Sequence, residues 1–312
     1  MRNWLLRWFR GSLPQTVGVY SGEAGVCLVK EERPSGYRCI YQPPVPEAEQ
    51  PALLSAMQKL RVLSVDDRWA LTLSVALDTD EVFVRPLVLP PGLSDEQVAQ
   101  IAIVEAVANL PVPPEEICLG FIREREGSDG DDMVRLAFCR RERVDEILAQ
   151  AETAATVVMV IDRDIQALHD ALVGAQGSPG LGDAFAYTFG IVTQIKPRLL
   201  ICLSANTFET YPLRIDESAG AAVHDALRQQ VATYWNRSCM LRSDETSQLS
   251  VLLFLDRPGL AETAIPAPSS SDELPPFRRV AKTDLQGVMM DEELEPPLEA
   301  RLIALGMAGR HL

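Results

Sequence analysis

Apolar and polar residues alternate along much of the N-terminal half of the chain, and this pattern divides it into short strands and helices. Residues 16–30 (TVGVYSGEAGVCLVK) alternate on both sides of a glycine-containing turn, which predicts a β-hairpin. Strands that alternate with helices are typical of an α/β fold. The pattern predicts further strands at residues 37–41, 69–77, 133–140 and 157–161, the second and fourth of them buried, and helices at residues 51–59, 143–153 and from residue 165 onward.

The segment 86–121 carries the clearest local signals, and it predicts strand, turn, helix, turn and strand in that order. A Pro-Pro-Gly turn ends the apolar run at residues 87–89, because proline lacks an N–H and glycine frees the turn. Ser94 and Gln97 have the spacing of a capping box, so we expect the helix to begin there and to reach Asn109. The proline-rich residues 110–114 then end it.

This predicted helix is apolar around most of its circumference, which indicates that it is covered on more than one side. One side would face the sheet of its own segment. The other side needs a cover that residues 86–121 do not supply. The apolar positions are Val98, Ile101, Ala102, Ile103, Val104, Ala106 and Val107.

Composition restricts the classes of partner. The chain has 312 residues, 47% of them hydrophobic and 23% charged, which is ordinary for a soluble globular protein of one or two domains. Its net charge of −15 argues against nucleic-acid binding, because phosphate contacts need clustered lysine and arginine. No apolar run reaches the roughly 18–20 residues of a membrane span. The six cysteines lack zinc-ligand spacing, so we interpret them as reduced thiols of a cytoplasmic protein.

No catalytic motif is present in the sequence. The three histidines are far apart, and HExxH, GxSxG and GxxxxGK[ST] patterns do not occur. Asp162 and Asp164 follow a predicted strand and could be catalytic carboxylates, but capping of the next helix is the favoured interpretation. We therefore expect no metal site and no catalytic residues.

The segment 86–121 resembles the insert subdomain of the PilM-type proteins, the actin-fold assembly factors of type IV pili, whose relatives include MshI-type proteins and the cytoplasmic domain of GspL-type secretion proteins. In that family a strand ends in proline, a Leu-Ser/Thr-acidic sequence starts a helix, and an acidic residue precedes a hydrophobic-Pro-hydrophobic-Pro exit. Pro90, residues 93–96, Glu105 and residues 110–113 stand at those places. The C-terminal helix predicted at residues 299–309, with Gly306 permitting close packing, also resembles the family.

The resemblance implies an α/β, actin-like (ribonuclease H-like) two-domain fold with a small insert subdomain in the first domain and a degenerate second domain. A second strand–turn–strand at residues 199–213 echoes the first hairpin, as the internal duplication of actin folds would require. The expected divisions are an amphipathic segment at residues 1–14, a first domain at 15–190 with its insert at about 82–140, and a second domain at 191–312 with a flexible loop at about 263–276.

Actin-like ATPases bind nucleotide phosphates in their two hairpin turns, and this chain departs from their pattern. Tyr20 occupies the position of the family's first aspartate, and a phenol cannot orient Mg²⁺ through water as a carboxylate does. Residues 202–204 (Cys-Leu-Ser) lack the second aspartate, and residues 256–259 replace a glycine cluster. We therefore expect no cofactor and no ATP hydrolysis. The vestigial nucleotide site would consist of Ser21, Gly22, Ser204 and Asn206.

The N-terminal segment is amphipathic. Trp4, Leu5, Trp8 and Phe9 share one helical face, with arginines mostly on the other, a pattern that suits a short helix at a membrane interface. A frayed terminus and a tail packed on its own domain remain alternative interpretations. The resemblance implies a cytoplasmic protein that is peripheral to the inner membrane of a bacterium, and a membrane contact of this segment would agree with that location.

The resemblance implies a function as a non-catalytic cytoplasmic scaffold in the inner-membrane assembly platform of a type IV pilus or a related secretion system. Its partner would be the cytoplasmic tail of a PilN-like membrane protein, held in a groove between the first domain and its insert, and a pilus assembly ATPase is also implied. We expect groove residues among Leu89, Ile101, Glu105 and Leu110, with burial in the subdomain core as the alternative. The alternative function is an actin-like ATPase that switches partner affinity.

Overall fold

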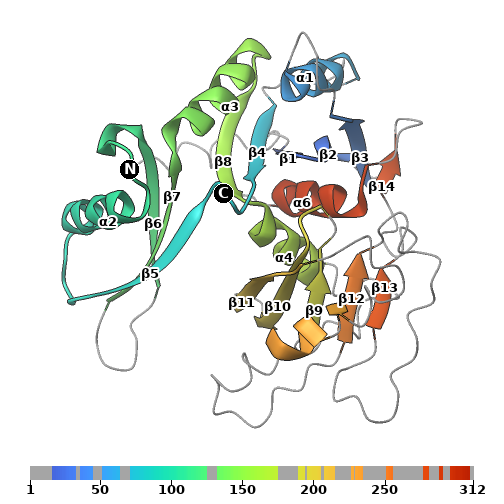
Figure 1. The fold of residues 1–312 in the computed structure, drawn as a ribbon. Helices are drawn as coiled ribbons and strands as arrows, with labels where there is room; N and C mark the ends of the chain where they lie inside the picture. The colour runs from blue at the N-terminus through green and yellow to red at the C-terminus, as the bar shows by residue number, and fades with distance from the viewer. Residues whose placement is uncertain are drawn as a thin grey trace.

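Three β-sheets organise the parts of the chain that the computed structural model describes (Figure 1). The described residues are 16–32, 36–44, 51–63, 71–124, 132–174, 189–193, 195–204, 207–214, 226–227, 229–234, 251–255, 277–280, 288–290 and 296–309. The N-terminal segment with Trp4, Leu5, Trp8 and Phe9, and the loop at residues 263–276, lie outside them.

The first sheet begins as an antiparallel meander and continues as a parallel sheet. Its order is β14 (Val288–Met290), β3 (Gly36–Gln42), β2 (Gly25–Glu32), β1 (Thr16–Gly22), β4 (Thr72–Leu77) and β8 (Val157–Arg163). β1 pairs antiparallel with β2 and parallel with β4, and β4 pairs parallel with β8. Gly25 makes the tight turn from β1 possible, because its φ of 101° is strained for any residue with a Cβ atom.

The second sheet repeats this topology. Its order is β11 (Thr207–Pro212), β10 (Arg198–Ser204), β9 (Phe189–Val192), β12 (Val251–Leu255) and β13 (Phe277–Val280). Again the first three strands form an antiparallel meander, and β9, β12 and β13 run parallel. Apart from β14, which pairs parallel with β3 at one edge of the first sheet, the two sheets have the same strand order, and this is the duplicated arrangement of the actin-like fold. The fold class predicted from the sequence is therefore confirmed. The described strands of the second sheet, β11-β10-β9-β12-β13, correspond in order to β3-β2-β1-β4-β8 of the first.

Alternation along β1 assigns its side chains to two cores. Val17 and Val19 pack with α1 (Ala52–Leu63) and α3 (Arg141–Thr153) on one face of the first sheet. Gly18 and Tyr20 face α4 (Asp164–Gly174) and α6 (Leu298–Ala308) on the other face. The first domain is thus a sheet between two helical layers, as Figure 1 shows.

The C-terminal helix α6 is buried on almost every side, between the first sheet and α4. Two glycines allow this close approach: a Cβ atom on Gly18 would lie 1.8 Å from the carbonyl oxygen of Ala304, and one on Gly306 would lie 1.9 Å from that of Ala167. The close packing predicted at Gly306 is confirmed. Residues 191–312 are predicted from the sequence to form the second domain, but two elements from that range contact the first sheet. β14 pairs with its edge strand β3, and α6 packs on the face that carries Gly18.

The insert is a separate three-stranded sheet with one helix on one face (Figure 1). The helix α2 (Asp95–Asn109) begins at Ser94, and both reciprocal hydrogen bonds of the predicted capping box with Gln97 are present. The remaining elements are β5 (Phe83–Leu89), the 3₁₀ turn η2 (Pro114–Glu116), β6 (Ile117–Glu124) and β7 (Asp132–Arg140), with the strand order β5-β7-β6.

Two burial predictions are wrong. β8 is not a buried strand, since Val157 and Met159 remain 49% and 47% exposed, and the reason is its position at the end of the sheet. α2 is covered on one side only: Ile103 and Val104 are 41% and 71% exposed on its outer side. No helix among the described residues is long and apolar enough to cross a membrane.

Candidate functional site

The two domains meet in a cleft at the end of β4, where the nucleotide site of an actin-like fold would lie. Lys196, from the turn between β9 and β10, places its Nζ atom 2.5 Å from Asp78, 3.1 Å from Asp80 and 3.4 Å from Glu23. Arg198 also forms an ion pair with Asp80. These ion pairs join the second sheet to the carboxylates that follow β4 and to the turn of the first hairpin.

The surroundings of Lys196 and Asp80 favour the charged forms of both side chains. Although partial burial disfavours the ammonium, its hydrogen bonds to Asp78 and Asp80 raise the pKa of Lys196 well above its usual value. Burial likewise tends to raise the pKa of Asp80, but the neighbouring Lys196 and Arg198 outweigh it and lower that pKa. Lys196 and Asp80 are therefore both ionised at neutral pH.

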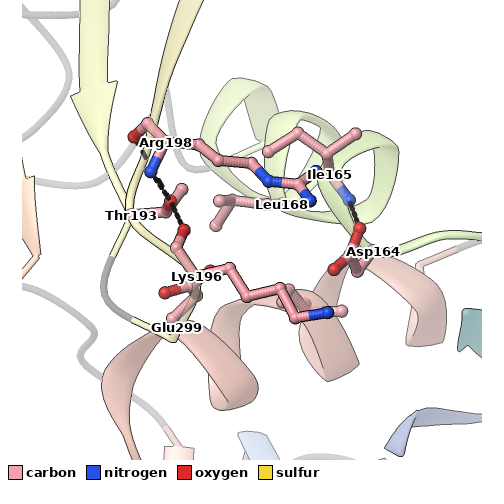
Figure 2. Close-up of a pocket in the computed structure, with 8 residues that line it drawn as sticks. Asp164, Ile165, Leu168, Thr193, Lys196, Arg198 and Glu299 are labelled. Atoms are coloured by element: carbon pink, nitrogen blue, oxygen red, sulfur yellow. Dashed lines mark hydrogen bonds between the residues drawn. The ribbon is translucent and has the colours of Figure 1, made fainter. Parts of the chain in front are cut away.

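Asp164 forms the opposite wall of the cleft, at the first position of α4 (Figure 2). Its carboxylate accepts hydrogen bonds from the backbone N–H groups of Thr79 at 2.9 Å and Ile165 at 2.6 Å, and from the hydroxyl of Thr79. Burial, together with the nearby charge of Asp78, raises the pKa of Asp164. Its contacts are those of a structural residue that ties the β4–β5 connection to the helix start.

The cleft that these residues enclose is small. Its volume is about 10 Å³, room for roughly one water molecule. Glu299 of α6 accepts a hydrogen bond from the Ile195 N–H at 2.6 Å, and Thr193 holds the turn by accepting from the Arg198 N–H at 2.9 Å. Among the lining residues drawn in Figure 2, Thr193 bonds to Lys196 and Arg198, and Asp164 bonds to Ile165.

Tyr20 closes the first hairpin beside this cleft. It is 3% exposed, and its hydroxyl packs against Gly22, where a Cβ atom would lie only 2.5 Å from it. Burial raises the pKa of Tyr20, with nearby carboxylates adding to the effect, so the phenol stays neutral. Of the four residues expected in a vestigial nucleotide site, Ser21 and Gly22 lie here at the end of β1, whereas Asn206 and the side chain of Ser204 lie outside the described residues.

A second, larger hollow lies between the first domain and the insert, and we call it the insert groove. Its volume is about 230 Å³. It is lined by Leu77, Val82, Cys118, Leu119, Gly120, Ala137, Phe138, Cys139, Val144, Ile161 and Asp162, which come from β4, β6, β7, β8, α3 and the β4–β5 connection.

Strand register explains why this hollow exists. Cys118 pairs with Cys139, and Gly120 pairs with Ala137, across β6 and β7. Because directly paired residues point to the same face of a sheet, these four small residues lie together and leave space. The large residues next to them point to the opposite face, where Phe138 and Leu136 pack in the core beneath α2.

The four residues expected to bind a partner do not line the insert groove. Leu89 and Leu110 are 7% and 6% exposed and belong to the core of the insert. Ile101 is 37% exposed on α2, and Glu105 accepts a hydrogen bond from the Asn109 side chain at 2.9 Å. The sequence does hold one signal for the groove: small residues alternate in both strands, at positions 118 and 120 and at 137 and 139.

Comparison with known proteins supports the fold. No family model and no curated protein matches the chain. Among solved structures, a chain of a PilM–PilN type IV pilus biogenesis complex superposes with a TM-score of 0.58 at 18% identity, over 94% of this chain and 98% of that chain. At that identity the likeness establishes a shared fold, and it agrees with the PilM-type resemblance.

Two further solved structures are less similar. The cytoplasmic domain of EpsL, an inner-membrane component of the type II secretion system of Vibrio cholerae, has a TM-score of 0.47 at 13% identity, covering 96% of each chain. A Bacteroides thetaiotaomicron protein with an actin-like ATPase fold and unknown function has a TM-score of 0.38 at 9% identity, over 79% of this chain and 84% of that one.

Proposed function

We propose that this protein is a non-catalytic scaffold of the inner-membrane assembly platform of a type IV pilus or a related secretion system. It binds the cytoplasmic tail of a PilN-like bitopic membrane protein in the insert groove. The observation that carries the proposal is the contrast between the two sites: the interdomain cleft is filled by its own ion pairs, whereas the insert groove is apolar and open. The structural likeness to a chain from a complex with PilN supports the choice of partner.

The contents of the cleft support the non-catalytic part. A nucleotide would have to displace Lys196 from Asp78 and Asp80, leaving two carboxylates facing phosphate groups of the same charge. A bound Mg²⁺ would offset this repulsion only if the domains opened, because the space of about 10 Å³ does not admit the ion with its waters. The protein therefore works without a cofactor and without ATP hydrolysis.

The groove suits an extended peptide that buries a few apolar side chains in it. Each fully buried aliphatic side chain contributes about 1.5–3 kcal/mol, so two or three anchors supply about 3–9 kcal/mol. A micromolar complex needs about 8 kcal/mol beyond the cost of association, so main-chain hydrogen bonds must add to the anchors. β8 borders the groove through Ile161 and is the last strand of the first sheet, so its outer edge can pair with a peptide main chain.

The membrane provides the setting for this interaction. Trp4, Leu5, Trp8 and Phe9 would hold residues 1–14 at the cytoplasmic surface of the inner membrane, close to where the partner's tail emerges. A pilus assembly ATPase would bind elsewhere on the scaffold. Nucleic acid is not among the proposed partners, given the net charge of −15.

Pull-down with immobilised synthetic N-terminal tails of PilN-like proteins from the same organism tests the proposal. We expect the full chain to be retained by one such tail and released by the free peptide. A chain retained by none of them would contradict the proposed partner. The non-catalytic part is tested separately by thermal-shift titration with Mg-ATP, for which we expect an unchanged melting temperature; a clear rise would favour the nucleotide-switched alternative.

A further inference from the structure

Two thiols face each other across the wall of the insert groove. Cys118 of β6 and Cys139 of β7 are directly paired, both line the groove, and both are free thiols. Directly opposed residues in antiparallel strands have Cβ atoms about 4.5–5.5 Å apart, and a disulfide needs about 3.5–4.5 Å. The two sulfurs can therefore be joined by a shift of roughly 1 Å.

The other thiol pair of the first domain provides a contrast. The sulfurs of Cys27 and Cys39 lie 3.4 Å apart, but both residues have no exposed surface, and α6 packs over them. Cys118 is partly exposed at the groove, whereas Cys139 is 7% exposed behind it. A reagent in solution can reach Cys118 without unfolding the protein, and it cannot reach Cys27 or Cys39.

We infer that Cys118 and Cys139 form a modification site that closes to an intramolecular disulfide by exchange with a low-molecular-weight disulfide such as oxidised glutathione. First the Cys118 thiolate attacks one glutathione sulfur, a mixed disulfide forms, and one glutathione leaves as its thiolate. The Cys139 sulfur then gives up its proton and attacks Cys118 Sγ, and the second glutathione leaves. The protein thiols lose two electrons and two protons, and one oxidised glutathione becomes two reduced molecules.

The order of the two steps follows from burial. Burial raises the pKa of Cys139 to about 12, and the neighbouring Cys118 adds to this rise, so Cys139 is a poor thiolate and the second step is the slow one. Raising the pH increases its thiolate fraction. Ring closure therefore accelerates with pH after Cys118 has already been modified.

Disulfide formation changes the surface to which a partner would bind, and this consequence rests on the proposed function. Drawing Cys118 towards Cys139 pulls β6 against β7 at the position where the small residues leave space. The neighbouring pair Gly120–Ala137 shifts with it. We expect the oxidised protein to bind the PilN-like tail at least roughly fivefold more weakly than the reduced protein, a difference of about 1 kcal/mol.

Peptide mapping tests the site without any knowledge of the partner. The full chain is incubated with mixtures of oxidised and reduced glutathione, alkylated, digested and examined by mass spectrometry. We expect a cross-linked peptide pair containing Cys118 and Cys139, with Cys27 and Cys39 still alkylated as free thiols, and no such pair in Cys118→Ser. A Cys139 that remains fully alkylated at every glutathione ratio would overturn the proposal, as would a Cys27–Cys39 disulfide that forms first.

Tail binding by the reduced and oxidised chains, followed by fluorescence anisotropy of a labelled tail peptide, separates the two claims. Weaker binding after oxidation that is absent in Cys118→Ser supports the consequence, and equal binding by both forms contradicts it. If the reduced chain binds no tail although the Cys118–Cys139 disulfide forms, the proposed function fails while the modification site stands.

Discussion

The ammonium group of Lys196 lies 2.5 Å from the carboxylate of Asp78, and this ion pair joins the two domains of the molecule. Asp78 follows the last residue of β4 in the first sheet, and Lys196 lies in the turn that leads into β10 of the second. The same ammonium contacts Asp80 and Glu23, so one lysine is held by three carboxylates. This network occupies the cleft and is the reason for our proposal that the protein does not hydrolyse nucleotide.

Removing that lysine is expected to loosen the contact between the domains. Lys196→Met removes the counter-charge of Asp78 and leaves Asp80 with Arg198 alone, and we expect a loss of about 1–2 kcal/mol in the free energy of unfolding, since the Lys196 side chain is 28% exposed and its charge is partly screened. Urea unfolding of the variant and the wild type at low and high salt measures this loss. The loss should shrink as salt is added, and Lys196→Arg should retain most of the stability. A variant as stable as the wild type at low salt would show that the network is not stabilising.

The pH dependence of stability should distinguish Asp164 from Asp80. Because the folded-state pKa of Asp164 is raised, its contribution is favourable below its unfolded pKa of about 3.9 and is lost as pH rises through the folded value. The ionised carboxylate therefore opposes folding at neutral pH. Asp164→Asn keeps an oxygen acceptor for Thr79 and Ile165, so we expect a higher urea midpoint than wild type at pH 8, with the difference vanishing towards pH 4.

Replacement of Asp80 should change the stability in the opposite direction from replacement of Asp164. Its folded-state pKa is lowered, so its contribution is present above the unfolded pKa and is lost as pH falls through the folded value. We expect Asp80→Asn to destabilise the protein at pH 7, by an amount that shrinks as the pH falls below the unfolded pKa of about 3.9 and is lost below the folded value. Equal pH profiles for the Asp80 and Asp164 variants would contradict the assignment of these two carboxylates to different environments.

Helix α6 should be intolerant of a single methyl group at Gly306. An alanine in a helix is ordinarily favoured over glycine by about 1 kcal/mol, but here its Cβ atom would lie 1.9 Å from a backbone oxygen of α4. We expect Gly306→Ala to cost about 2–4 kcal/mol, measured by urea unfolding. Gly309→Ala is the matched control, because the nearest atoms to its Cβ would lie 3.8 Å away. Similar stabilities for the two variants would argue against the close helix packing.

Local signals in the sequence were sufficient to predict where the helix of the insert begins and ends. Prolines, the Ser94–Gln97 capping box and the apolar run of β5 predict where α2 begins and ends, because each acts within a few residues. Burial of β8 was predicted wrongly, since an apolar run does not reveal that its strand ends a sheet. The exposure of Val157 and Met159 depends on neighbours that only the topology supplies.

The two sites depend on contacts between distant residues, and this explains why the sequence did not predict their lining. Lys196 and Asp78 come from different domains, and nothing in either local sequence indicates the other. The groove exists because the register places Cys118 beside Cys139 and Gly120 beside Ala137. A one-residue change of register would move these side chains to the opposite face. Leu89 and Leu110 were plausible groove residues by pattern, and packing places them in the core instead.

Calorimetric titration of Gly120→Leu with the PilN-like tail peptide tests the central claim most directly. A Cβ atom on Gly120 would have no atom within 4 Å apart from the residue's own chain neighbours, so we expect a leucine there to enter the groove without disturbing the strand. We predict unchanged melting temperature and binding at least roughly tenfold weaker than wild type, while Ile103→Ala on the outer side of α2 binds normally. Gly120→Leu binding the tail as tightly as the wild type would contradict the account.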